Sequence, residues 1–315
     1  MTAAPTTREK TPQRRKRATS GAQRSESRVA WAFSAPALFL LLAFIVLPFL
    51  MAFVLSFTNQ RLISPLQTKF VGVDNYVDTL TSTTFWKAFF NNVWFVVIVV
   101  PVQTAFALWL AILVNRKIPG RVFFRTAFFL PVVTVMAAAA VIWSLLFNAN
   151  GLVNAIMETV TFGAFTPDWL NSTTWALPAM MIVGIWQGVG FQMVILLAAL
   201  QDVPEVLYEA ASIDGASRWQ QFMNVTLPGI RNGLIFVITV TTILAFRLFD
   251  QVYIMPRVPG GPLNSTRTMM LELVETGFGA QAIGRGAAIA VIFFVIVLVL
   301  TLIQRRFIRE EGEVT

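Results

Sequence analysis

Two charged residues interrupt an apolar stretch of this chain, and they are the first candidates for chemistry. Arg247 and Asp250 follow an apolar run that begins at Leu234. A charged side chain in such a run is costly unless it faces an interior or a water-filled path. If the run continues as one α-helix, Phe246, Arg247 and Asp250 share one face of it. An aromatic ring, a guanidinium and a carboxylate together suit a ligand that has both apolar faces and hydroxyl groups.

The same residues also fit a structural role, and this alternative stays open. Arg247 and Asp250 are three positions apart, where opposite charges on a helix neutralise each other. Phe246 can serve packing, and Gln187, a polar residue in the preceding apolar run, can bridge two helices. Other chemistries are excluded, because the chain contains no His and no Cys. Imidazole acid–base catalysis, thiol chemistry, disulfides and the common zinc sites need those side chains, so we expect no catalytic residue and no metal site.

A further candidate is the polar loop Gln201–Asn232, which joins two apolar runs. Asp202 and Glu205 have the spacing of a capping box and predict a helix start. Gly215 is placed to end that helix, and Pro228 to end a second short helix before the next apolar run. The loop therefore predicts a helix–turn–helix that lies across a membrane face, or, as the alternative, an amphipathic hairpin without a partner.

The composition shows what positions these residues. The chain has 315 residues, of which 56% are hydrophobic and 13% are charged, with a mean hydropathy of +0.69. A soluble domain carries about 25% charged residues, so an ordinary soluble enzyme is excluded. Six apolar runs come close to the ~20 residues that cross a bilayer: Ala30–Phe57, Val93–Val114, Thr126–Phe147, Trp175–Leu200, Leu234–Phe246 with its continuation, and Gly286–Ile303. We predict an all-α polytopic membrane protein with six transmembrane helices.

The basic residues predict the orientation of these helices. Residues 1–28 contain eight Lys and Arg against two acids, and such a polar segment is expected to be disordered. Together with the 115–125 turn, the 201–232 loop and the carboxyl tail, that side of the membrane holds seventeen Lys and Arg, against five on the other. Cytoplasmic loops carry the excess of positive charge, so both termini are expected in the cytoplasm. The basic tail then sets orientation and touches anionic lipid, rather than binding nucleic acid.

One motif in the 201–232 loop is specific. Glu209-Ala210-Ala211, then Asp214-Gly215-Ala216, then Leu227-Pro228 resemble the loop of the membrane-spanning subunits of binding-protein-dependent type I ABC importers. The resemblance implies that fold, with a cytoplasmic coupling helix that docks on the ATPase subunit. The residues expected to carry the coupling are Glu209, Ala210, Ala211, Asp214, Gly215, Leu227 and Pro228.

Other segments resemble one subfamily of these importers. Phe70–Tyr76, Arg125–Pro131 and Gly260-Gly261-Pro262 are similar to stretches of the maltose-type carbohydrate permeases, specifically the first of their two different permeases. In that subfamily the sugar is held near mid-membrane by the fourth and fifth of these spans. The resemblance therefore implies a substrate site at Gln187, Gly190, Met193, Phe246, Arg247 and Asp250.

The resemblance also implies a division of the chain. The predicted parts are a disordered basic cytoplasmic tail (1–28), a first transmembrane helix (29–57), a periplasmic loop (58–88), an ABC permease core of five helices that includes the coupling loop (89–307), and a cytoplasmic tail (308–315).

The expected function is a permease subunit that forms the pathway for a sugar delivered by an extracytoplasmic binding protein. The chain has no Gly-rich phosphate loop of the G-x-x-x-x-G-K-[ST] type, so ATP and Mg²⁺ are expected on partner ATPase subunits. The implied partners are a second permease subunit, two ATPase subunits and the binding protein, in a bacterial or archaeal cytoplasmic membrane. The alternatives are an importer for a non-sugar solute such as an amino acid or a phosphonate, a polytopic membrane enzyme, and a stand-alone channel or carrier.

Overall fold

The structure, a computed structural model, describes residues 20–63, 67–116 and 119–310. Within those ranges it is helical, and its extended pairing is one isolated bridge between Thr58 and Phe70. The contacts divide the chain into two compact units, 1–51 and 52–315, which are described separately. The predicted all-α membrane fold is confirmed: five described helices are long and apolar enough to cross a membrane, or six if a sharply bent pair counts as one span.

The first unit is one apolar helical stretch. It comprises α1 (Ser20–Leu41), a five-residue π-helical turn (Leu42–Val46) and the beginning of α2 (Leu47–Leu55). Helix α1 begins at Ser20, inside the segment that we expected to be disordered. Lengthening an existing helix costs far less than nucleating a new one, so the apolar span can extend into its polar flank. The rest of the predicted tail, residues 1–19, lies outside the described residues.

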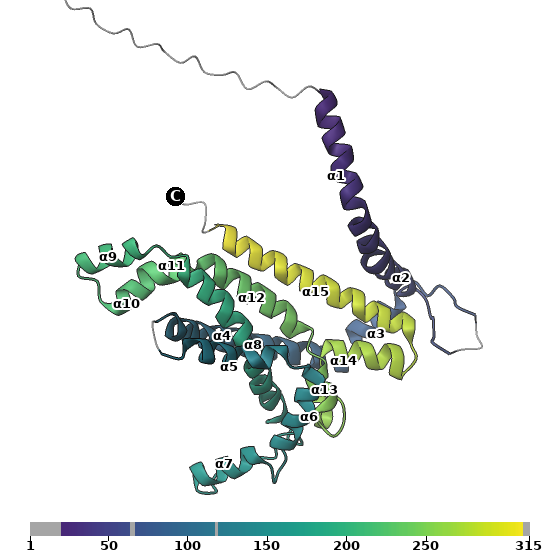
Figure 1. Cartoon of the computed structure of the whole chain (residues 1–315). Coiled ribbons are helices and arrows are strands. Elements are labelled where there is room, and N and C mark those ends of the chain that lie inside the picture. The colour runs from purple at the N-terminus through teal and green to yellow at the C-terminus, as the bar shows by residue number, and fades with distance from the viewer. Residues whose placement is uncertain (1–19, 64–66, 117–118, 311–315) are drawn as a thin grey trace, which may run out of the picture. The chain divides into compact units, whose positions relative to one another are not determined.

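The second unit is built on four long helical segments. These are α4 (Thr83–Asn115), α8 (Ala176–Gln201), α12 (Arg231–Phe246) and α15 (Ile283–Glu310). Figure 1 shows them running between an end that carries α9 (Glu205–Ile213) and α10 (Arg218–Gln221) and an end that carries α13 (Asp250–Ile254) and α14 (Met269–Val274). The shorter elements are α3 (Asp74–Thr81), α7 (Leu152–Thr161), α11 (Leu227–Gly229), π-helical turns at Phe222–Thr226 and Glu275–Gly279, and a 3₁₀ turn at Pro262–Asn264.

The third predicted span is not one helix. It consists of α5 (Arg121–Val133) and α6 (Met136–Leu146), which are bent by 100° at the break between them. Thr134 is extended, with φ −74° and ψ 138°. Its backbone N–H and its hydroxyl both donate to the carbonyl of Pro131, at 3.2 and 2.6 Å. The break follows Pro131 and a run of β-branched residues, both of which weaken a helix.

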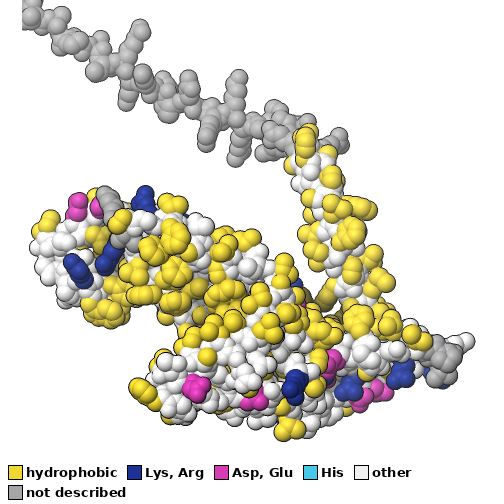
Figure 2. All heavy atoms as spheres, turned by 60° about the horizontal axis from the view of Figure 1, so that its bottom comes forward, with side chains coloured by type: hydrophobic (Ala, Val, Ile, Leu, Met, Phe, Trp, Pro, Cys, Tyr) yellow, Lys and Arg dark blue, Asp and Glu magenta, His cyan; other side chains and the backbone are white. Residues whose placement is uncertain are grey.

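The charged and hydrophobic side chains of the second unit are segregated. Figure 2 shows hydrophobic side chains over the middle of the visible face and charged ones toward its ends. Inside, the long helices approach closely through small residues and polar bridges, as helices do in a membrane. For example, the amide nitrogen of Gln192 on α8 donates to the hydroxyl of Thr241 on α12, and Gln192 is fully buried.

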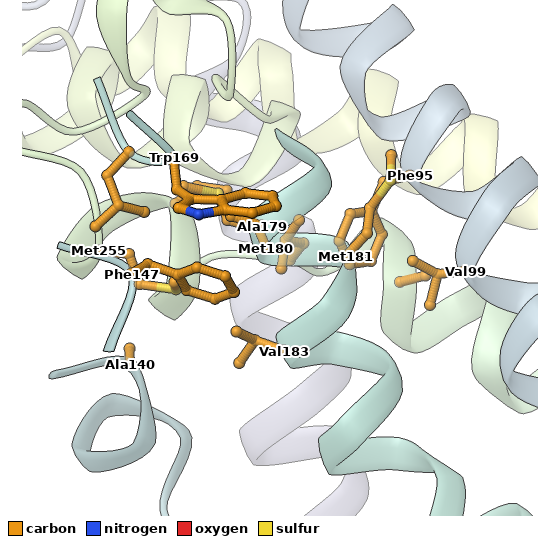
Figure 3. Packing of buried hydrophobic residues seen from close by; sticks show 14 of the residues in the cluster. Phe95, Val99, Ala140, Phe147, Trp169, Ala179, Met180, Met181, Val183 and Met255 are labelled. Carbon is orange, nitrogen blue, oxygen red and sulfur yellow. The ribbon is translucent and has the colours of Figure 1, made fainter. Parts of the chain in front are cut away.

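The largest buried cluster packs the end of the second unit that carries α13 (Figure 3). The rings of Phe147 and Trp169 have centroids 5.4 Å apart, and the indole N–H of Trp169 donates to the side-chain oxygen of Asn154 at 2.8 Å. Met180 and Val183 of α8 belong to the same cluster and are fully buried. This packing fixes α6, α8 and α13 relative to one another, and the candidate site lies beside it.

Candidate functional site

The fifth span is broken where its charged residues lie. Helix α12 ends at Phe246, and α13 begins at Asp250 after Phe249, which has φ −137° and ψ −60°. The sequence at the break contains no Pro and no Gly. The helical backbone is therefore interrupted at residues 247–249, although Arg231–Ile254 still counts as one span long enough to cross a membrane. The expected face that joins Phe246 to Arg247 and Asp250 is not formed.

Side chains from other helices satisfy the backbone that the break frees. Asn92 of α4 donates its amide to the carbonyl of Phe246 at 3.1 Å and accepts from the N–H of Met269 at 2.8 Å. The hydroxyl of Thr268 donates to the carbonyl of Leu248 at 2.9 Å. Asn92 and Thr268 are both fully buried. Backbone at membrane depth needs such partners, so these contacts hold the break open.

A cavity of about 500 Å³ lies at this break. Its walls come from α4, α5, α6, α8, α12 and the broken segment. The polar residues that line it are Gln103, Gln187, Thr241, Arg247, Asp250 and Gln251. The aromatic ones are Phe95, Phe191 and Phe249. This size and this mixture of apolar walls with a few converging polar groups are typical of a small-molecule site.

Three amide side chains give the cavity its hydrogen-bonding character. Gln251 is 4% exposed, and its side-chain oxygen is buried without a partner. Its amide nitrogen lies 3.7 Å from the sulfur of Met136. Gln187 donates to the carbonyl of Thr134 at 3.3 Å, at the bend between α5 and α6. Gln103 lies against Gly188, where a Cβ would come within 2.4 Å of the amide nitrogen of Gln103. Each amide offers both donors and an acceptor.

Arg247 and Asp250 both line the cavity from opposite sides of the break. Arg247 is exposed and Asp250 is half-buried. The structure records no ion pair between these two described residues, whereas it does pair Arg267 with Glu272 and Glu275. Both cavity charges are therefore available to a ligand.

Three of the residues expected at the site lie elsewhere. Phe246, the last residue of α12, is 2% exposed and does not line the cavity. Gly190 is the contact point between α8 and α5: a Cβ there would lie 2.1 Å from the carbonyl oxygen of Phe128. Met193 has no exposed surface and belongs to a second core cluster around Leu196 and Val237. The structure thus brings Gln187, Arg247 and Asp250 together but not these three.

Sequence reasoning missed Gln103 and Gln251 as members of the site. Gln103 is a polar residue within the apolar run of the second span, which is itself a signal of an interior role. Gln251 follows Asp250 directly, but a continuous helix would have pointed it about 100° away. The part played by Asn92 has no sequence signal, because its partners are more than 150 residues away.

The 201–232 loop forms the predicted helix–turn–helix, with two differences. Helix α9 starts at Glu205 without a side-chain cap, so the Asp202 capping box is not formed. The second helix begins at α10 with a capping box between Ser217 and Gln220, and continues through a π-helical turn to α11, so it passes Pro228 and ends at Gly229.

Hydrogen bonds within the loop hold its corner in place. Gly215 has φ +75°, which glycine adopts without strain. The amide of Gln221 donates to the hydroxyl of Ser212 at 3.0 Å and to the carbonyl of Ala216 at 3.2 Å. The hydroxyl groups of Tyr208 and Thr226 lie 3.0 Å apart and join the two helices. These hydrogen bonds join the two helices of the loop and its corner into one unit.

The outer surface of the loop carries most of the motif residues. Glu209, Ala210, Asp214, Gly215 and Pro228 are exposed, and Ala211 and Leu227 are half-buried. Large apolar side chains are exposed beside them: Val206 at 68%, Ile213 at 86% and Trp219 at 67%.

Comparison with known proteins agrees with this architecture. The lactose transport system permease protein LacF of Rhizobium radiobacter is 33% identical over 282 residues, covering 89% of this chain and 94% of that protein. The trehalose/maltose transport system permease protein MalF of Thermococcus litoralis is 32% identical over 286 residues, covering 90% and 95%. A solved bacterial ABC transporter involved in the import of the acidic polysaccharide alginate contains a chain of the same fold, with a TM-score of 0.74 at 21% identity, covering 92% of this chain and 98% of that one.

The family described as "binding-protein-dependent transport system inner membrane component" matches residues 103–310, which hold most of the cavity lining and the helix–turn–helix loop. The resemblance carried by the loop motif is thereby confirmed. The chain belongs to this family of multi-pass membrane components, and it is a permease subunit of an ABC transporter rather than an enzyme.

Proposed function

We propose that this chain forms, with a second permease subunit, the transmembrane pathway of an importer for a sugar or a sugar derivative. Two relatives that match nearly its whole length carry names that specify lactose and trehalose or maltose transport. The observation that carries the proposal is the cavity at the broken fifth span, where amide and charged side chains from α4, α8 and α13 converge with aromatic rings.

The cavity has the chemistry that a sugar requires. Phe249, Phe191 and Phe95 offer ring faces to the apolar face of a sugar. Gln103, Gln187 and Gln251 can each donate to and accept from hydroxyl groups. The unpartnered oxygen of Gln251 gains a donor when a hydroxyl binds. A ligand without that hydroxyl leaves a buried acceptor unsatisfied, and such mismatches discriminate strongly between ligands.

Arg247 and Asp250 narrow the substrate class further. Both are available to a ligand, and both can hydrogen-bond to sugar hydroxyl groups in the strong, charge-assisted manner. A sugar that bears an acidic or an amino group would pair with one of them directly. We therefore favour a charged or amino-bearing sugar over a neutral one such as maltose.

We assign the helix–turn–helix loop to the coupling of transport to ATP hydrolysis. We place it in the cytoplasm, against an ATPase subunit that binds ATP and Mg²⁺, with Glu209 at the edge of the contact and the small side chains of Ala210 and Ala211 allowing close approach. The exposed apolar side chains of α9, which include Val206 and Ile213, gain from burial against a partner. Closure of the ATPase subunits then moves the loop as a rigid piece and reorients the cavity.

The cytoplasmic position of the loop also implies the orientation of the whole chain in the membrane. Both termini lie in the cytoplasm, following the excess of Lys and Arg on that side. A loaded binding protein docks on the opposite side, on residues 58–90 and 148–174. The different affinities of the inward and outward states for ATP and for the loaded binding protein supply the coupling energy.

The test of the substrate class is uptake by cells that lack the chromosomal copy of this chain and carry it on a plasmid. Radiolabelled monosaccharides, disaccharides, amino sugars, acidic sugars and amino acids are offered separately. Saturable, plasmid-dependent uptake of a saccharide is expected. Uptake of an amino acid alone would refute the sugar assignment and leave the importer assignment standing.

The coupling loop is tested separately by co-purification. Glu209→Ala is expected to reduce the amount of ATPase subunit that co-purifies with the chain. Glu158→Ala, the same change at an exposed position on α7, is the matched control and should leave co-purification unchanged. Equal recovery from both variants would contradict the docking role of the loop.

A further inference from the structure

A second cavity in the membrane-spanning part differs sharply from the polar one. It has a volume of about 550 Å³ and lies between α4, α5 and α8. Its walls are apolar, with Phe106, Phe128, Pro131, Ile182, Trp186 and Val189 among them. None of these residues lines the polar cavity. Such walls offer a hydrophilic solute no hydrogen-bond partner, whereas a hydrocarbon chain can pack against them.

One end of this groove is basic. Arg121 is the first residue of α5, and Arg125 follows one turn later. Because Arg121, Arg125 and Phe128 lie at positions i, i+4 and i+7, they form one stripe along the helix. Along this stripe the two Arg residues come before Phe128, which lines the groove, and Pro131 lies about 9 Å farther along the helix axis than Arg125. Arg116, at the end of α4, adds a third cation at the same turn.

This positive charge is not compensated within the described chain. The Nε atom of Arg125 is buried and has no hydrogen-bond partner. No ion pair is recorded for Arg116, Arg121 or Arg125 among the described residues, and the first turn of α5 holds no acidic residue. The N-terminus of α5 contributes a further partial positive charge. An anion at this position would therefore be held by several groups at once.

The neighbouring aromatic residues mark this end as a membrane interface. Phe106 and Trp109 of α4 are stacked, with ring centroids 5.7 Å apart. Trp109 is 55% exposed and lies about two turns before the end of α4. Trp is enriched at the level of lipid headgroups. Figure 1 shows the beginning of α5 at the same end of the second unit as α9 and α10.

We propose that the groove binds one anionic phospholipid, with its phosphate on Arg121 and Arg125 and an acyl chain along Phe128 and Pro131. Basic pockets between transmembrane helices are where acidic headgroups bind, and anionic lipids are abundant in the cytoplasmic leaflet. Charge complementarity decides for a lipid over a second protein subunit, since three cations beside an apolar groove match a phosphate that carries a hydrocarbon chain. The site is distinct from the sugar cavity and does not depend on the identity of the transported solute.

The test uses the purified full chain in detergent. The midpoint of thermal unfolding is measured against added dioleoylphosphatidylglycerol or dioleoylphosphatidylcholine, and native mass spectrometry counts the lipids retained. Phosphatidylglycerol is expected to raise the midpoint more than phosphatidylcholine does. Arg125→Gln should weaken the apparent affinity for phosphatidylglycerol about fivefold, as expected for one Arg near a charged headgroup.

Two further variants separate the headgroup from the chain. Ala127→Phe fills the groove from an exposed position on α5 and should abolish lipid retention while leaving the midpoint without lipid unchanged. Arg61→Gln removes an exposed Arg outside the groove and should behave like the wild type. Any variant whose lipid-free midpoint falls is replaced by a milder one, Ala127→Leu or Arg125→Lys, so that lipid binding is compared between folded proteins.

Three results would overturn the proposal. If phosphatidylglycerol and phosphatidylcholine raise the unfolding midpoint equally, the site does not recognise an anionic headgroup. Equal protection by inorganic phosphate would make the site one for a free anion. Cross-linking of Ala127→Cys to a second permease subunit in the assembled importer, with no lipid retained, would assign the groove to a subunit interface.

Discussion

The third and fifth spans are both broken, but for different reasons. The third breaks after Pro131, and Thr134 caps the break with its own N–H and hydroxyl. The fifth breaks after Phe246, where the sequence offers no Pro and no Gly, and distant residues bind its free backbone groups. The first break is thus built from local contacts and the second from tertiary ones. The cavity lies between them and is lined by residues from both.

This comparison explains why the two breaks should respond differently to mutation. A locally capped break keeps its partners when the rest of the protein shifts. A break held from outside depends on α4 and on the segment before α14 staying in place. The following substitutions test that difference, in order of decreasing expected effect.

The largest effect is expected from Asn92→Leu. This change leaves the carbonyl of Phe246 and the N–H of Met269 buried without partners, at a cost of about 1–3 kcal/mol each. The protein should lose about 3 kcal/mol of stability, and uptake should be lost with it. Thermal unfolding in detergent and uptake in cells are the measurements. A loss of stability smaller than that of Thr268→Val would contradict the account in which Asn92 satisfies two backbone groups.

Thr268→Val should come next. It removes the hydroxyl that donates to Leu248 and that accepts from the N–H of Leu271 at 3.3 Å. Since Thr268 is fully buried, the expected loss of stability is about 2 kcal/mol. Thermal unfolding measures it. An unchanged unfolding midpoint would mean that the fifth-span break does not depend on this contact.

Asp250→Ala tests the cavity rather than the break. Asp250 lies at the first turn of α13 and has no recorded ion-pair partner among the described residues, so its loss should leave stability nearly unchanged. If it binds the substrate, the KM for uptake should rise about tenfold, the loss of one charge-assisted hydrogen bond. Uptake kinetics measure this, together with co-purification of the partner subunits. Asp250→Asn, which keeps one acceptor, should fall between; a wild-type KM in both variants would remove Asp250 from the site.

The smallest effect is expected from Thr134→Val. The hydroxyl is lost from an exposed residue, but the N–H of Thr134 still donates to Pro131 at 3.2 Å. The loss of stability should stay below about 1 kcal/mol, and uptake should change less than twofold. Since this is the same substitution as Thr268→Val, the two unfolding midpoints compare the breaks directly. A larger loss of stability from Thr134→Val than from Thr268→Val would contradict the distinction between a break stabilised locally and one stabilised by other helices.

Most of the fold could be predicted from the sequence because a membrane imposes simple rules. Apolar runs of the right length must be helices, and five of the six predicted spans correspond to helical segments long enough to cross a bilayer. The 201–232 loop was predictable because Gly215 and the polar composition act locally, although the capping box expected at Asp202 is not formed. The bend in the third span was less visible, since Pro131 lies inside an apolar run that is long enough for one helix.

The site was predictable only in part. Arg247 and Asp250 stood out as charges in an apolar run, and both do line the cavity. Phe246 was placed beside them by assuming a continuous helix, but it is buried on α12 and does not line the cavity. Gly190 serves the contact between α8 and α5 instead, and Met193 belongs to the core. Helical periodicity assigns faces correctly only where the helix is intact.

The membrane segments, the position of the 201–232 loop and the charged residues that interrupt the spans could all be read from the amino-acid sequence. They follow from hydrophobicity, local turn residues and charge, which are properties of neighbouring residues. The tertiary structure decided where the fifth span breaks and which polar side chains meet there. Asn92 and Gln103 come from α4, more than 130 residues before Thr241 and Gln251, and only the packing of the long helices brings their amides to the broken segment. The contact is possible because a freed carbonyl within a membrane must find a donor, and the nearest donor belongs to another helix.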